Sequence, residues 1–199
     1  MKKLSLVTVG VLALICLTGC TKNNNLKIDA NQPLTKVGQY HEADSDDPKI
    51  TLLAIKNMKK SQKVGQVTFN FKKAKLMKMD AKSKSQLSDD ETNFGINLSK
   101  TYYEYQLDYT IKNSSNSEIN DNGAELILPN GKQVSSNEGA MDSLGGEKIQ
   151  AHASKGGFIQ AKVSKKDKNK LNKFKFVTPE LFDNTYNKVN IQQHTITLK

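Results

Sequence analysis

The run of residues 102–113 constrains the fold more than any other part of this 199-residue sequence. Its even positions after Tyr102 are polar or charged, and its odd positions are aromatic or aliphatic: Tyr103, Tyr105, Leu107, Tyr109 and Ile111. Five consecutive alternations match a β-strand, in which successive side chains point to opposite faces. Because aromatic residues favour strands, this run predicts a central strand of a sheet.

Shorter stretches with the same period predict further strands. They are residues 67–71, 124–128, 132–136, 158–163 and 174–176. Up to Phe71 the apolar residues occupy odd positions; they then move to even positions at Ala74 and Leu76 and return to odd positions at Met77. This change predicts a bulge or a strand buried on both faces. Residues 50–55 fit either a short strand or one helical turn.

Turn residues separate these predicted strands. Asn130-Gly131 predicts a hairpin with a type I′ turn, because both residues tolerate a positive φ. Residues 80–100 are polar and predict a long loop, and the lysine-rich residues 165–173 predict a solvated turn. Val189 and Ile191 have the opposite parity to Ile196 and Leu198, which predicts a bulge near residues 192–194.

About seven short strands with turns between them, and no long helical period, predict an all-β fold. Such a pattern is typical of an antiparallel β-sandwich. We expect Cys16 to be removed with the N-terminal leader and Cys20 to carry a lipid. The mature chain would then have no cysteine free to form a disulfide, so its stability must come from the apolar core.

Several of these stretches together resemble a known family. Residues 103–115, Glu118-Ile119, residues 126–131 and residues 157–163 are similar to immunoglobulin-like extracellular domains of Gram-positive lipoproteins, related to the immunoprotective extracellular protein fold. The resemblance implies an immunoglobulin-like sandwich over residues 63–199. It implies no catalytic or ligand-binding residue.

The first twenty residues have the layout of an export signal. Two lysines precede an apolar stretch, residues 4–17, that is too short to cross a bilayer as a helix. Leu17, Thr18, Gly19 and Cys20 follow, and they resemble the bacterial lipobox. This resemblance implies cleavage after Gly19 and a lipid on Cys20.

These features predict three parts of the chain. Residues 1–19 form a lipoprotein signal peptide, residues 20–62 form the lipidated N-terminus and a largely flexible tether, and residues 63–199 form the sandwich domain. Two acyl chains hold a protein firmly on a membrane. The sequence therefore predicts a protein anchored through Cys20 to the outer face of the cytoplasmic membrane.

The charge of the chain narrows the classes of partner. The formal net charge is +10, and every basic residue is lysine, with no arginine. Nucleic-acid readers use the arginine fork to bind guanine and phosphate, so this composition argues against a nucleic-acid partner. A lysine-rich surface is attracted to anionic lipids and wall polymers, although it also serves solubility alone.

The sequence offers few candidate site residues. His41, His152 and His194 have no metal-ligand spacing around them, and no nucleophile or phosphate-loop motif occurs. We therefore expect no catalytic residue, no metal and no cofactor. Tyr102 and Glu104 fall on the solvent parity of the central strand, where an exposed aromatic beside a carboxylate is a candidate binding surface.

These observations predict a non-catalytic cell-surface lipoprotein. It would present its sandwich, as a binding or accessory module, to an envelope protein or an anionic wall polymer. Two alternatives remain open: an immunity or phage-exclusion lipoprotein, and an enzyme whose site converges only in the fold. A solute-binding lipoprotein fits less well, because the chain has no βαβ pattern for two lobes around a cleft.

Overall fold

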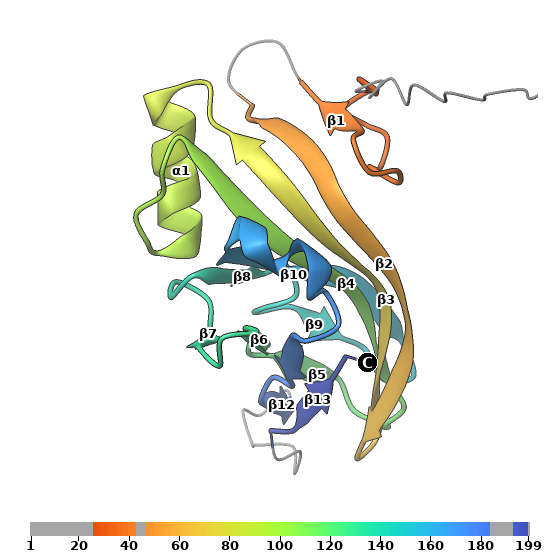
Figure 1. Ribbon diagram of the computed structural model, residues 1–199. Coiled ribbons are helices and arrows are strands. Elements are labelled where there is room, and N and C mark those ends of the chain that lie inside the picture. The colour runs from red at the N-terminus through yellow and green to blue at the C-terminus, as the bar shows by residue number, and fades with distance from the viewer. Residues whose placement is uncertain (1–25, 43–46, 184–192, 199) are drawn as a thin grey trace, which may run out of the picture.

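A computed structural model describes residues 26–42, 47–183 and 193–198 of the chain. The described residues form an all-β fold in which a large, strongly curved sheet packs against two smaller sheets on its concave side (Figure 1). All paired strands are antiparallel. The predicted all-β sandwich class is therefore confirmed.

The large sheet has six strands. In spatial order they are β1 (Tyr40–His41), β2 (Lys49–Val64), β3 (Val67–Asp80), β4 (Thr101–Asn113), β10 (Ser154–Val163) and β8 (Ala140–Asp142). The predicted central strand is β4, which lies between β3 and β10.

The small sheets close the other side of the sandwich. One contains β13 (Thr195–Thr197), β11 (Lys175–Val177), β6 (Glu125–Ile127) and β7 (Gln133–Val134) in that order. The other contains β12 (Leu181–Asp183), β5 (Ile119–Asp121) and β9 (Lys148–Ile149). The helices are α1 (Lys84–Phe94) and the 3₁₀ helix η1 (Lys165–Asn169).

The main core fills the space between the large sheet and the small ones. Phe176 of β11 lies with its ring centre 5.0 Å from those of Phe71 and Tyr109, and Phe174 stacks on Tyr105 at 3.7 Å. Aromatic rings bury large areas and add about 1 kcal/mol per favourable pair. These contacts come from strands that the alternating pattern predicts, so the pattern identifies the main core correctly.

The predicted irregularity in β3 is confirmed. The pairing of β3 with β4 shifts between Phe71 and Lys73, which moves the core-facing parity from odd to even positions. Beyond this bulge both faces are buried, because Leu76 packs in the main core and Met77 in a second one.

The prediction of a long loop over residues 80–100 is wrong. Ser83 caps α1 by accepting a hydrogen bond from the Gln86 amide, and Gly95 ends it with a φ of +63°. Within the helix only Gln86 and Phe94 are buried, so the sequence has no apolar stripe of helical period to reveal it.

The helix covers a second, smaller core on the opposite face of β4. This core unites Phe94 and Leu98 with Leu34, Leu52 and Tyr102. It lies at the end of the large sheet that β1 and the start of β2 also form (Figure 1).

The predicted flexible tether over residues 20–62 is wrong for its described part. Leu34 and Leu52 are buried, β2 begins at Lys49, and Gly38 donates a hydrogen bond to the Leu52 carbonyl at 2.9 Å. The predicted domain boundary at residue 63 falls inside β2. Composition does not reveal that this segment is packed, because its few apolar residues are separated by many polar ones.

One detail of the turns differs from expectation. The hairpin between β6 and β7 forms, but Gly131 has a positive φ (+88°) and Asn130 does not, so the turn is not type I′. At the C-terminal end Ile196 and Leu198 are buried as expected, whereas Val189 and Ile191 lie outside the described residues.

Candidate functional site

The expected lipidation site, Cys20, lies outside the described residues, as do Leu17, Thr18 and Gly19. Cleavage after Gly19 and lipidation of Cys20 therefore stay predictions. Among the residues that the structure does describe, no helix is both long and apolar enough to cross a membrane.

The expectation that Tyr102 and Glu104 form an exposed surface is wrong. Their side chains are 2% and 3% exposed, because α1 covers the even face of β4 at this end. The Tyr102 hydroxyl donates a hydrogen bond of 2.5 Å to Asp90 of α1. This hydrogen bond between Tyr102 and Asp90 therefore holds α1 against the large sheet.

Glu104 is a buried acid beneath this helix. Burial, and then the negative charge of Asp90, raise its pKa to about 8. Gln160 of β10 donates a hydrogen bond of 3.3 Å to one of its oxygens. At neutral pH this carboxyl group mostly holds its proton, which lowers the cost of burying it next to Asp90.

A second group of buried acids lies in the main core. The Tyr109 hydroxyl donates to both oxygens of Asp142, at 2.8 and 2.9 Å, and the Ala124 amide donates to the same carboxylate at 2.7 Å. Burial, and then the charge of Asp142, raise the pKa of nearby Asp121 to about 8. The Oδ2 atom of Asp121 has no hydrogen-bond partner among the described residues.

These acids are candidates for acid–base chemistry only if a substrate reaches them. Asp121 is 1% and Asp142 is 9% exposed. The hydrogen bonds to Asp142 join β8 to Tyr109 of β4 and to Ala124, which lies between β5 and β6, so they cross-link segments that are distant in sequence. A sequence reading misses it, because an aspartate in a turn such as Asp121-Asn122-Gly123 is usually solvated.

The strongest surface feature is a concentration of lysines from two distant segments. Residues 53–75 contain seven lysines and no acid, and residues 165–175 contain six lysines and one acid, Asp167. The first segment covers β2 and β3, and the second covers η1 and the start of β11. Beyond Thr51, the outer edge of β2 is an open edge, because no strand of the described residues pairs with it there.

Two hollows lie along this open edge. One, of about 270 Å³, is lined by Ile55 and Lys56 of β2 and by residues 168, 169, 171 and 172 around the end of η1. The other, of about 410 Å³, lies between residues 60 and 62–65 at the tip of the β2–β3 hairpin and residues 194–197, which include β13. We call these two hollows and their lysines, Lys56, Lys60, Lys63 and Lys168, the basic cleft.

The positive charge of the basic cleft is not balanced within the described residues. Lys56, Lys63 and Lys168 are exposed, and none of them has an ion-pair partner there. The one acid of η1, Asp167, accepts hydrogen bonds from the Ser164 amide and from Lys170. Clustered charge of one sign raises the local concentration of oppositely charged ligands.

Sequence reasoning found the lysines but not the cleft. It treats residues 165–173 as an isolated solvated turn, and only the fold places this turn beside β2. The absence of any acid over residues 53–75 is the signal that points to one half of the cleft.

A third hollow, of about 540 Å³, lies where the segment after α1 meets the β6–β7 hairpin and η1. Lys132 and Lys162 line it, together with Asp167 and apolar side chains such as Ile96 and Leu128. Its mixed lining favours no class of ligand as clearly as the basic cleft does.

The three histidines do not come together. His41 makes a hydrogen bond of 2.7 Å with the Gln32 carbonyl, His152 has a φ of +60°, and His194 lines the basic cleft. Nowhere in the described ranges do three or more histidine, cysteine, aspartate or glutamate side chains gather as a metal site would require.

Comparison with known proteins identifies the fold and no function. The sequence matches no protein-family model and no curated protein. The structure is similar to that of a functionally unknown protein from Listeria monocytogenes EGD-e, with a TM-score of 0.52 and 16% sequence identity over 76% of this chain and 87% of that one. The yjhA protein from Bacillus subtilis also matches, at a TM-score of 0.49 and 17% identity, over 72% of this chain and 99% of that one. The first likeness shows that this curved β-sandwich occurs elsewhere, while membership of the immunoglobulin-like lipoprotein family stays a prediction.

Proposed function

We propose that the protein is a non-catalytic lipoprotein, anchored through Cys20 to the outer face of the cytoplasmic membrane, whose basic cleft binds an anionic polymer of the cell envelope. The observation that carries the binding role is that Lys56, Lys63 and Lys168, from two distant segments along one edge of the sandwich, are exposed and have no ion-pair partner among the described residues. The lipobox-like residues 17–20 support the anchor.

The shape of the cleft favours an extended ligand. Its two hollows are lined by residues of β2 and its turn from Ile55 to Gly65, a stretch that spans at most about 30 Å. A linear polymer with regularly spaced phosphate or carboxylate groups can contact lysines along that length, whereas a single small anion can occupy one hollow only. Exposed lysines each contribute little, so affinity would come from several contacts made together.

Binding is tested with cell walls of a Gram-positive bacterium, with and without extraction of their anionic polymers. The lysine-to-glutamine variant at positions 56, 63 and 168 should bind intact walls on the order of tenfold more weakly than the wild type, if each lysine contributes about 0.5 kcal/mol. Extracted walls should bind the wild type weakly.

A matched variant controls for net charge. Lys84, Lys100 and Lys132 are exposed and lie outside the basic cleft, so replacing them with glutamine removes the same charge. Equal losses in the two variants would show that only total charge matters. Binding that survives polymer extraction would favour a protein partner, which the immunity alternative requires.

The anchor is tested separately on the chain expressed in a bacterium that lipidates exported proteins. Mass spectrometry should find a lipid on an N-terminal Cys20, and Cys20→Ser should release the protein from the membrane fraction. Cys16→Ser should change neither result, since residue 16 would leave with the signal peptide.

A further inference from the structure

Two apolar side chains stand out at the surface. Among the described residues, the large hydrophobic side chains that are exposed are Leu26, at 47%, and Val37, at 64%. Both belong to the first described segment, residues 26–42, which follows the expected anchor. The apolar exposure is therefore concentrated in one segment.

This segment is fixed to the rest of the domain. The Tyr40 amide donates to the Leu26 carbonyl and the Ile28 amide donates to the Tyr40 carbonyl, both at 3.0 Å. Tyr40 in turn pairs with Thr51 of β2, and Leu34 is buried in the second core. Leu26 and Val37 are thus presented by backbone that is hydrogen-bonded to its surroundings.

The distance along the chain to the expected anchor is short. Cys20 precedes Leu26 by six residues, and an extended chain spans at most about 3.5 Å per residue. A lipid on Cys20 would therefore hold Leu26 within about 20 Å of the membrane surface.

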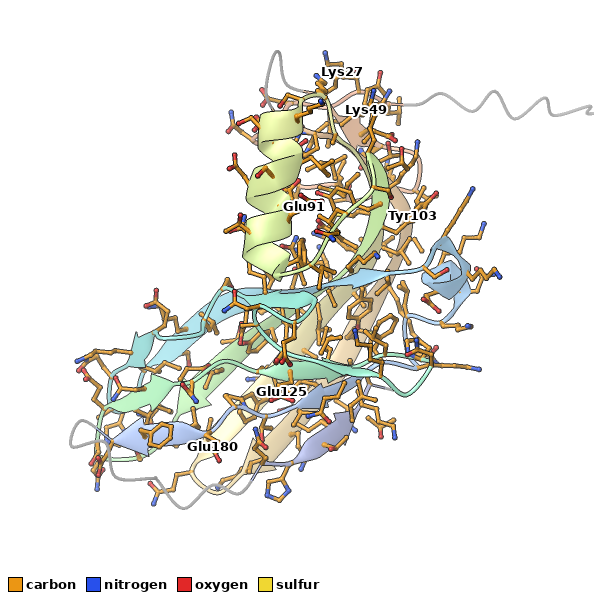
Figure 2. All side chains as sticks on the ribbon, turned by 90° about the vertical axis from the view of Figure 1, so that its left-hand side faces the viewer. Lys27, Lys49, Glu91, Tyr103, Glu125 and Glu180 are labelled. Carbon is orange, nitrogen blue, oxygen red and sulfur yellow. The ribbon has the colours of Figure 1, made fainter. Side chains whose placement is uncertain are left out.

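The residues around these two side chains suit a membrane interface. Lys27 and Lys36 are their sequence neighbours, and the Lys49 ammonium lies 4.2 Å from the centre of the Tyr40 ring. Figure 2 shows Lys27 and Lys49 at the same end of the molecule. Tyrosine and lysine are favoured at headgroup level, where their apolar parts meet the lipid. Acids also occur here, since Glu42 lies 3.9 Å from Lys49, so the apolar side chains rather than net charge would provide the contact.

We propose that Leu26 and Val37 seat the domain on the outer leaflet of the membrane that holds Cys20, an inference that rests on the proposed lipid anchor. Seating would fix the orientation of the whole domain. β2 runs from Lys49 near this end to Val64 at the far end, 16 residues or about 50 Å of strand. The basic cleft would then point away from the membrane, toward the wall.

The test uses the lipidated full-length product, labelled at its methyl groups and placed in lipid nanodiscs. Intact mass first establishes the lipid on Cys20. A paramagnetic lipid in the bilayer should then remove most of the NMR signal intensity of the Leu26 and Val37 methyl groups. The methyl signals of Ile196, beside the basic cleft, should keep theirs.

A variant separates seating from simple tethering. Leu34 is buried at the same end and reports on both forms. In the Leu26→Ser/Val37→Ser double variant, Leu34 should lose most of its paramagnetic broadening while the lipid stays attached. If a lipidated chain shows equal broadening at Val37 and Ile196, the seating is wrong and the anchor stands; if mass spectrometry finds no lipid, both are wrong.

Discussion

The two faces of β4 serve two cores that differ in how they are built. The odd face meets strands from the second layer through a set of aromatic rings, with Phe176 at the centre. The even face meets one short helix and the N-terminal segment. Each face also carries a tyrosine that donates to an aspartate of another element: Tyr109 to Asp142, and Tyr102 to Asp90.

One alternating strand can therefore be buried on both sides at one end. The main core unites long strands whose pairing depends on the whole fold, so damage there should unfold the domain. The second core is smaller and includes a helix with few apolar contacts, so damage there should open a local part first.

The largest effect is expected from Phe176→Ala. Phe176 is fully buried and touches three other rings, so its loss should lower the free energy of unfolding by about 4 kcal/mol. Phe94→Ala should instead raise hydrogen exchange mainly in α1. Denaturant unfolding and hydrogen exchange of both variants measure this, and equal global destabilisation would show that the two cores form one unit.

A somewhat smaller loss is expected from Gly95→Ala. Gly95 has a φ of +63°, and a Cβ atom there would lie 1.9 Å from the Asn137 carbonyl oxygen, so the end of α1 must move. Gly131→Ala is the control, with a φ of +88° and open space around it, and should cost only about 1 kcal/mol. Thermal unfolding should show the larger loss in the Gly95 variant; similar losses would mean that this contact does not fix the helix.

Asp142→Asn should destabilise the main core by about 2 kcal/mol. The carboxylate accepts hydrogen bonds from the Tyr109 hydroxyl and from the Ala124 and Leu144 amides. The side-chain NH₂ group of an asparagine cannot accept a hydrogen bond, so one of these donors would lose its acceptor. Asp90→Asn at the helix should cost less, because the amide can still accept the Tyr102 bond through its oxygen. Urea unfolding of the two variants compares the two tyrosine–aspartate pairs.

The smallest effect, counted per pH unit, is a pH dependence that both cores share. Asp121 and Glu104 have pKa values of about 8 in the folded protein, against about 4 in an unfolded chain. The folded protein thus keeps protons that the unfolded chain releases, so these groups stabilise fully below about pH 4 and lose that contribution as the pH rises to about 8. Each contributes a slope of at most about 1.4 kcal/mol per pH unit. Asp121→Asn and Glu104→Gln should each flatten the fall in unfolding free energy between pH 5 and 8, and an unchanged slope would show that the group is ionised in the fold.

The main core could be predicted from the sequence because each of its strands shows an alternation of apolar and polar residues within its own segment. Tyr105, Leu107 and Tyr109 alternate with polar residues, and the parity change after Phe71 indicates the bulge in β3. The second core could not, because Leu34, Leu52 and Phe94 are isolated among polar residues and meet only in the fold. For the same reason Tyr102 and Glu104 were expected in solvent, since nothing in their own strand reveals the helix above them.

The basic cleft could not be predicted from the sequence either, because its lysines come from segments that meet only in the fold. Lys56 and Lys168 are 112 positions apart, and each reads as a solvated lysine in its own segment. Composition predicts an anionic partner for the chain as a whole, but only the contact between β2 and η1 suggests the location that we propose for its binding.

The most direct test of this location is lysine footprinting of the wild-type protein with and without purified anionic wall polymer. Acetylation at each lysine is measured by mass spectrometry. The proposed location of the binding site predicts that the polymer protects Lys56, Lys63 and Lys168 and leaves Lys84, Lys100 and Lys132 unchanged. Equal protection of both sets, or protection of the second set alone, would contradict it.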